Sequence, residues 1–150
     1  MVSSMIGNAL EWYDYALYGQ LAYIISALFF PESTETVALI QTFAIFSIGF
    51  FVRPLGGILF GRIGDKYGRK HALSVSVLMM AISTGMIGLM PTYESIGIAA
   101  PIMLVIIRIV QGLSIGGELG GAITYLVEHS PGHKRGLFGS MVMFSLVIGF

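Results

Sequence analysis

Long apolar runs dominate the chain, and short polar segments separate them. Four runs are long enough to cross a membrane as helices, which takes about 20 mostly apolar residues each. Pro31 ends the first run, and Pro91 ends the third. None shows the strict alternation of a β-strand. We therefore predict helices at 5–30, 37–60, 72–90 and 98–127, and a fifth that starts near Gly136 and is still running at Phe150.

The polar segments differ in charge, which predicts an orientation. Segments 60–71 and 128–136 hold six of the eight Lys and Arg residues, whereas 31–36 and 91–95 hold none and carry glutamates instead. Lys and Arg are retained on the cytoplasmic side of membranes. We predict an all-α polytopic membrane protein with a cytoplasmic N-terminus. The chain stops inside the fifth span, so we expect it to be a fragment of a longer protein.

Composition agrees with the membrane class. The 150 residues are 55% hydrophobic and 11% charged, with a mean hydropathy of +0.85, whereas soluble domains have about 25% charged residues. The formal charge is zero, so no basic surface would attract nucleic acid. Cysteine is absent, which excludes disulfides and thiolate metal sites. No basic region precedes the first apolar run, so we expect a true span and no cleaved signal.

Five charged residues lie inside the predicted spans: Glu11, Asp14, Arg53, Arg108 and Glu118. Each costs roughly 2.5–3.5 kcal/mol at mid-bilayer, and such residues usually face a polar interior or a substrate path. At 100° per residue, one arc of about 120° on the first span collects its polar side chains: Asn8, Glu11, Asp14, Tyr15 and Tyr18. Residues seven apart form one face of the fourth span: Gln111, Glu118 and Tyr125.

Arg53 is predicted to lie at the same depth in the membrane as two acids of the first span. Arg53, Glu11 and Asp14 each lie about 10–13 Å from the cytoplasmic end of their helix, at 1.5 Å per residue. An ion pair between Arg53 and either acid is therefore possible. Two interpretations stay open for this group. It is either a purely structural pair or part of a site that binds substrate or a proton.

The chain contains 20 glycines, and several recur at a spacing of four residues. Gly112, Gly116 and Gly120 do so on the fourth span, and Gly57 and Gly61 do so on the second. Small residues let membrane helices approach closely, so we interpret these glycines as packing positions. Pro54 removes an internal hydrogen bond from the second span and should bend or loosen it.

Segment 61–70 resembles the loop signature of the major facilitator superfamily. That signature reads Gly-x-x-x-Asp-(Arg/Lys)-x-Gly-Arg-(Arg/Lys), where x is any residue. The chain matches it fully, between the second and third spans as in the superfamily, with Gly61, Asp65, Lys66, Gly68, Arg69 and Lys70. The fourth span resembles a second superfamily element, Arg-x-x-Gln-Gly, with Arg108, Gln111 and Gly112.

A narrower resemblance covers nearly the whole chain. The segments GNALEWYDYALYG, FFVRPLGGILFGRIGDKYGRK and RIVQGLSIGGELGGAITYLVEHSP are similar to the metabolite:proton symporter family. The resemblance implies the major facilitator fold, with twelve helices in two halves, each built of inverted three-helix repeats. Residues 1–150 would be an N-terminal transmembrane domain that lacks the sixth helix and its partner, the C-terminal half. The resemblance further implies uptake of a small metabolite at the bacterial inner membrane, with a proton as coupling ion and no cofactor.

The resemblance also implies residue roles. Asp65 and Arg69 would belong to a cytoplasmic gate that closes against the C-terminal half. Burial of a carboxylate disfavours its charged form, so Glu118 and Asp14 are the leading candidates to carry the proton, followed by Glu11. The substrate and proton pathway would comprise Glu11, Asp14, Tyr15, Tyr18, Arg53, Arg108, Gln111 and Glu118.

Other protein classes fit the sequence less well. No nucleophile–base set accompanies Glu11 and Asp14, and the glycine-containing loop lacks Gly-Lys-Ser/Thr, so we expect no enzyme. His129 and His133 could suggest a metal, but Pro131 breaks the helix that would align them, and a solvated loop is the better interpretation. A channel or a small structural membrane protein is the other rival.

The substrate is not fixed by the sequence. Arginines suit a carboxylate, and tyrosines suit a quaternary ammonium group through cation–π contacts. A zwitterion would use both features, which favours a proline/betaine carrier. An organic-acid:proton symporter for citrate, α-ketoglutarate, shikimate or a dicarboxylate stays open. A sugar carrier or a drug:proton antiporter of the same superfamily is less favoured.

Overall fold

The computed structural model describes residues 2–128 and, beyond them, residues 136, 140, 144 and 147. The described part of the chain is helical and contains no strand, which confirms the all-α prediction. Its helices are α1 (Val2–Phe29), α2 (Glu35–Tyr67), α3 (Arg69–Leu89), α4 (Tyr93–Ile96) and α5 (Ala99–Glu128).

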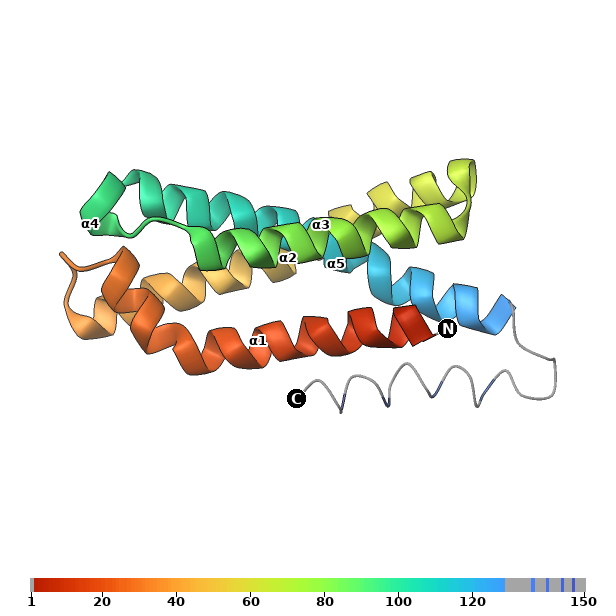
Figure 1. Ribbon diagram of the computed structural model, residues 1–150, viewed down its shortest axis with the longest axis horizontal. Helices are drawn as coiled ribbons and strands as arrows, with labels where there is room; N and C mark the ends of the chain where they lie inside the picture. The colour runs from red at the N-terminus through yellow and green to blue at the C-terminus, as the bar shows by residue number, and fades with distance from the viewer. Residues whose placement is uncertain (1, 129–135, 137–139, 141–143, 145–146, 148–150) are drawn as a thin grey trace.

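The long helices run in alternating directions, as successive membrane spans do (Figure 1). The start of α1, the α2–α3 turn and the end of α5 lie at one end of the bundle. The α1–α2 loop and α4 lie at the other. By length and composition α2, α3 and the Ala99–Gly117 part of α5 could cross a membrane. The 28-residue α1 has the length of a span, but its polar face makes it less apolar.

The backbones of α2 and α5 touch where the two helices cross. A Cβ atom on Gly112 would overlap the backbone of Gly49, and a Cβ atom on Gly116 would overlap the backbone of Arg53. No larger residue fits at these positions without moving a helix. The interpretation of Gly112 and Gly116 as packing positions is therefore confirmed.

The two glycines predicted to pack on α2 differ. A Cβ atom on Gly57 would lie 3.3 Å from the carbonyl oxygen of Gly116, so Gly57 belongs to the crossing. A Cβ atom on Gly61 would meet none of the described atoms within 4 Å, so close packing at Gly61 stays a prediction.

The predicted loop at 60–71 is mostly helical in the structure, so that boundary was wrong. Helix α2 continues to Tyr67, and α3 starts at Arg69. The break between them is Gly68, whose φ of 95° is the left-handed conformation that favours glycine. The apolar run ends near Phe60, but nothing in residues 61–67 stops a helix, so α2 extends beyond its apolar span.

Other predicted boundaries were also imprecise. The expected polar loop after Pro91 contains the short helix α4, which Gly97, with a φ of 60°, ends. Pro54 lies inside a continuous α2, and the predicted bend stays a prediction. The loop at 129–135 lies outside the described residues, as does most of the predicted fifth span, of which residues 136, 140, 144 and 147 are helical.

Candidate functional site

The polar face of α1 turns toward α2 and α5, as the helical spacing predicts. Glu11 and Tyr18 are almost fully buried, each only 3% exposed. Tyr13 and Ile24, on the opposite face, are more than half exposed in the described part. The inward face carries acids and phenols at one-turn intervals, so two neighbouring helices can each meet one of them. The side chain of Asn8, predicted on this face, lies outside the described part.

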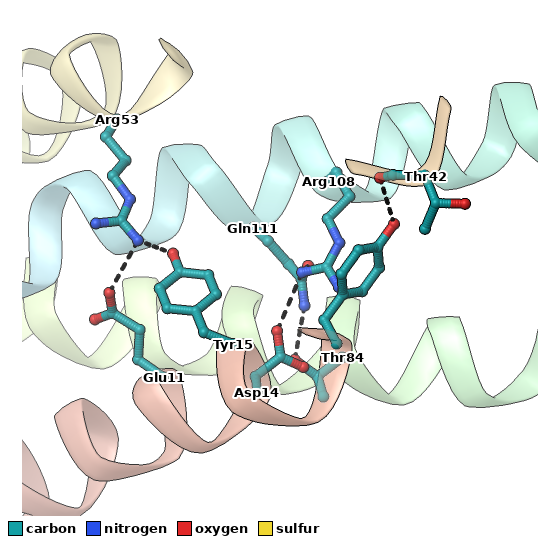
Figure 2. Close-up of polar contacts among 9 residues, drawn as sticks. Glu11, Asp14, Tyr15, Thr42, Arg53, Thr84, Arg108 and Gln111 are labelled. Atoms are coloured by element: carbon teal, nitrogen blue, oxygen red, sulfur yellow. Dashed lines mark hydrogen bonds and ion pairs between the residues drawn. The ribbon is translucent and has the colours of Figure 1, made fainter. Parts of the chain in front are cut away.

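Glu11 forms an ion pair with Arg53 of α2 (Figure 2). The Arg53 Nη2 lies 3.3 Å from the Glu11 Oε1 and also donates to the Tyr15 hydroxyl. The guanidinium carbon lies 4.3 Å from the centroid of the Phe50 ring and 4.9 Å from that of Tyr15. The prediction that Arg53 can pair with an acid of the first span is confirmed, and Glu11 is that acid.

Asp14 forms a second, deeper ion pair with Arg108 of α5 (Figure 2). The Arg108 Nη1 lies 3.1 Å from the Asp14 Oδ2, and the Arg108 side chain is 3% exposed. Its guanidinium carbon lies 3.8 Å from the centroid of the Tyr18 ring. Asp14 is paired with Arg108, so the alternative ion pair between Arg53 and Asp14 does not form.

Three hydrogen bonds hold the groups around Arg108. The Arg108 Nη1 also donates to the Gln111 Oε1 at 2.7 Å, and the Gln111 Nε2 donates to the Thr84 hydroxyl of α3 at 2.8 Å. The Tyr18 hydroxyl donates to the backbone carbonyl of Thr42 on α2 at 3.1 Å. Side chains of α1, α3 and α5 and the α2 backbone therefore meet around one arginine.

Aromatic rings connect the two ion pairs. Phe46 of α2 stacks on Tyr18 with centroids 5.0 Å apart, and Phe50 stacks on Tyr15 at 5.4 Å. Phe46 and Phe50 also meet each other edge to face at 5.3 Å. Each arginine thus lies against the face of a tyrosine, in an aromatic cluster of Tyr15, Tyr18, Phe46 and Phe50.

The four charges of this site sum to zero, because two carboxylates face two guanidinium groups. Some polar atoms of these side chains nevertheless lack a hydrogen-bond partner among the described residues. Within residues 2–128, the Glu11 Oε2, the Arg53 Nε and the Arg108 Nε are buried without a hydrogen-bond partner. Buried polar groups are normally satisfied, and each exception calls for an explanation. These atoms give the site unused capacity for a ligand with both a donor and an acceptor.

Most residues of the predicted site lie close together in the structure, and their functional role stays a prediction. The structure brings together Glu11, Asp14, Tyr15, Tyr18, Arg53, Arg108 and Gln111. The Glu118 side chain lies outside the described residues. Thr42, Thr84, Phe46 and Phe50 were missed. The spacing of Phe46, Phe50 and Arg53 puts them on one face of α2 and could have revealed the two rings, whereas the apolar α3 gives no such signal for Thr84.

The gate motif lies apart from this site, at the α2–α3 turn. Asp65 and Arg69 form an ion pair across Gly68, with the Asp65 Oδ1 2.9 Å from the Arg69 Nη2. Both side chains are well exposed, so the pair adds little to stability. The Lys66 Nζ lies 5.1 Å from the centroid of the Tyr67 ring. These contacts stay within the motif and leave its role in a gate as a prediction.

A helical bundle of this kind, with membrane-length helices and paired charges between them, is typical of a multi-pass membrane protein. The model of the sugar (and other) transporter family matches residues 1–150, so the chain belongs to that family, within the major facilitator superfamily. The superfamily prediction is confirmed. The bacterial relatives below and the membrane-length helices place it in the bacterial inner membrane.

Three curated relatives match the whole chain. It is 45% identical over 150 residues to the proline/betaine transporter of Escherichia coli K12, and 46% identical to the glycine betaine/proline/ectoine/pipecolic acid transporter of Dickeya dadantii. It is 44% identical over 151 residues to a putative proline/betaine transporter of Staphylococcus aureus COL. The chain spans 30%, 30% and 32% of these relatives, respectively. No solved structure gives a significant match.

Proposed function

We propose that this chain is the N-terminal part of a secondary transporter that imports a zwitterionic osmolyte, such as proline or betaine, together with a proton. The observation that carries the proposal is the pair of arginines, each already neutralised by a carboxylate of α1. A site with no net charge suits a substrate with no net charge. The names of the three relatives support the same substrate class.

The site has groups for both ends of a zwitterion. A guanidinium can bind a substrate carboxylate through two parallel hydrogen bonds. The aromatic cluster can hold a quaternary or secondary ammonium group through cation–π contacts. A citrate or dicarboxylate carries at least two carboxylates, whereas protonation of one acid of α1 would free only one arginine for them. The organic-acid alternative is therefore disfavoured.

Asp14 and the substrate carboxylate would compete for Arg108, and this competition would couple transport to a proton. A proton that enters from outside and binds to Asp14 would neutralise its carboxylate and release Arg108 for the substrate carboxylate. After the two halves rock to face inward, substrate would leave, Arg108 would return to Asp14, and the proton would pass to the cytoplasm. The Asp65–Arg69 pair would act at the cytoplasmic gate. Glu118 and Glu11 are the other predicted carriers.

One uptake panel tests this proposal. The full-length protein is expressed in cells without their own osmolyte carriers, and uptake of labelled betaine, proline, citrate and α-ketoglutarate is measured with and without a protonophore. We expect uptake of betaine and proline only, and its loss with the protonophore. Preference for citrate or α-ketoglutarate would contradict the substrate class, and uptake that persists with the protonophore would contradict proton coupling.

A further inference from the structure

The contacts around Arg108 include a residue of α3 that the transport mechanism above does not use. Thr84 accepts the hydrogen bond from the Gln111 Nε2 at 2.8 Å. It thereby satisfies the NH₂ group of the Gln111 amide while the oxygen end faces Arg108. The oxygen end is the one that can accept from the guanidinium, and it does so at 2.7 Å.

We propose that Thr84 is a positioning residue for proton coupling, which acts through Gln111 to hold Arg108 against Asp14. This inference rests on the proposed function. The chain of contacts runs from Thr84 on α3 to Gln111 and Arg108 on α5, and from there to Asp14 on α1. Figure 2 shows the four side chains close together, with dashed lines marking these contacts.

The amide of Gln111 has two orientations, and they have opposite effects on Arg108. With the oxygen toward Arg108, the amide accepts from the guanidinium. With the NH₂ group toward Arg108, it would present donors to a group that has only donors. Gln111 is 2% exposed, so water does not compensate for the wrong orientation. Arg108, which has only donors, therefore sets the first orientation, and the Thr84 hydroxyl stabilises it by accepting from the NH₂ group.

Arg108 has little else to hold it on the side of α3. On the side of α1, the Tyr18 ring supports the guanidinium and is itself held by the Thr42 carbonyl. The Arg108 Nε has no partner within the described residues. Loss of the Gln111 contact would therefore let the guanidinium rotate about its bond to Asp14.

Thr84 also lies beside Asp14 in space. Both residues line one cavity of about 240 Å³ between α1 and α3, whose other walls are largely apolar. Movement of α3 relative to α1 would thus change the Thr84–Gln111 contact at the same time as the surroundings of Asp14. Through Thr84, α3 would take part in the coupling of the Asp14–Arg108 pair.

The test compares two transport modes of the full-length protein in proteoliposomes. Proton-driven uptake of labelled betaine needs the proton to be released inside, whereas betaine exchange at equal pH does not. We expect Thr84→Val to lower driven uptake about fivefold or more relative to exchange, because a buried amide is left unpaired. Thr84→Ser keeps the hydroxyl and should restore the wild-type ratio.

Ser83→Ala is the matched control. Ser83 is 3% exposed and donates only to the Met79 carbonyl of its own helix. Its loss should leave the ratio unchanged. The double variant Thr84→Val with Gln111→Leu should be no worse than Gln111→Leu alone, because residues that act in one chain are not additive. Each variant is judged by its ratio of driven uptake to exchange, so the comparison does not depend on the amount of folded protein.

Two results would overturn the inference. One is an equal fall of uptake and exchange in Thr84→Val, which indicates a role in folding alone. The other is that uptake and exchange both stay at their wild-type rates in Thr84→Val. A wild-type protein that takes up neither betaine nor proline would instead refute the proposed function, and the role of Thr84 in coupling would fall with it. The two failures are thus distinguishable.

Discussion

Glu11 and Asp14 lie one turn apart on α1, yet each is paired with an arginine from a different helix. The sequence predicts their depth and their common face, because both follow from helix geometry. It leaves Arg53 with a choice of two acids, because it does not show how α2 is rotated relative to α1. Thr84 was beyond prediction for the same reason, since its role depends on how α3 packs against α5.

The pairing predicts which charge substitutions are coupled. We expect Glu11→Gln or Arg53→Gln alone to destabilise the protein by about 3 kcal/mol, the lower end for a broken buried pair, because Arg53 is 24% exposed. The double variant should lose much less than the sum. Thermal unfolding of the full-length protein in detergent measures this.

Asp14→Asn combined with Arg53→Gln is the control for that cycle, because the two residues belong to different pairs. Their effects should be closer to additive than those of Glu11 and Arg53. A stronger coupling between Asp14 and Arg53 than between Glu11 and Arg53 would show that the pairing is wrong.

At the scale of the helix, apolar runs predicted the long helices well and their ends poorly. A run of apolar residues marks the part of a helix that lipid covers, whereas the helix itself ends where the backbone is broken. Helix α2 therefore extends past Phe60 to Tyr67, and Gly68 ends it. The glycine spacing predicted close packing, but not that Gly49 and Arg53 of α2 would supply the opposing backbone.

The α2–α5 crossing predicts a sharp difference between two glycine substitutions. Gly112→Ala should destabilise the protein by about 1–3 kcal/mol or more, because the new methyl group would overlap the Gly49 backbone. Gly85→Ala, on α3, meets no described atom within 4 Å and should be neutral or slightly stabilising, because alanine favours helix by about 1 kcal/mol. Thermal unfolding compares them, and equal effects would contradict the crossing.

At the scale of the whole molecule, the uneven distribution of Lys and Arg among the loops and the alternating directions of the helices indicate the same orientation of the chain. The basic segment 61–70, the start of α1 and the end of α5 lie at one end of the bundle (Figure 1). The superfamily could be predicted from two short motifs, since both lie at the expected helix positions. The transport site could be predicted only in part, because a cavity between two halves cannot be derived from one of them.

The central claim is that the Asp14–Arg108 pair couples a proton to a zwitterion. Its most direct test is the pH outside weakly buffered proteoliposomes that contain the full-length protein, recorded as betaine is added. We predict that the medium becomes alkaline as betaine enters with the wild type, and that Asp14→Asn abolishes this change while it keeps betaine exchange. Betaine entry without proton movement in the wild type, or an unchanged proton-to-betaine ratio in Asp14→Asn, would contradict the account.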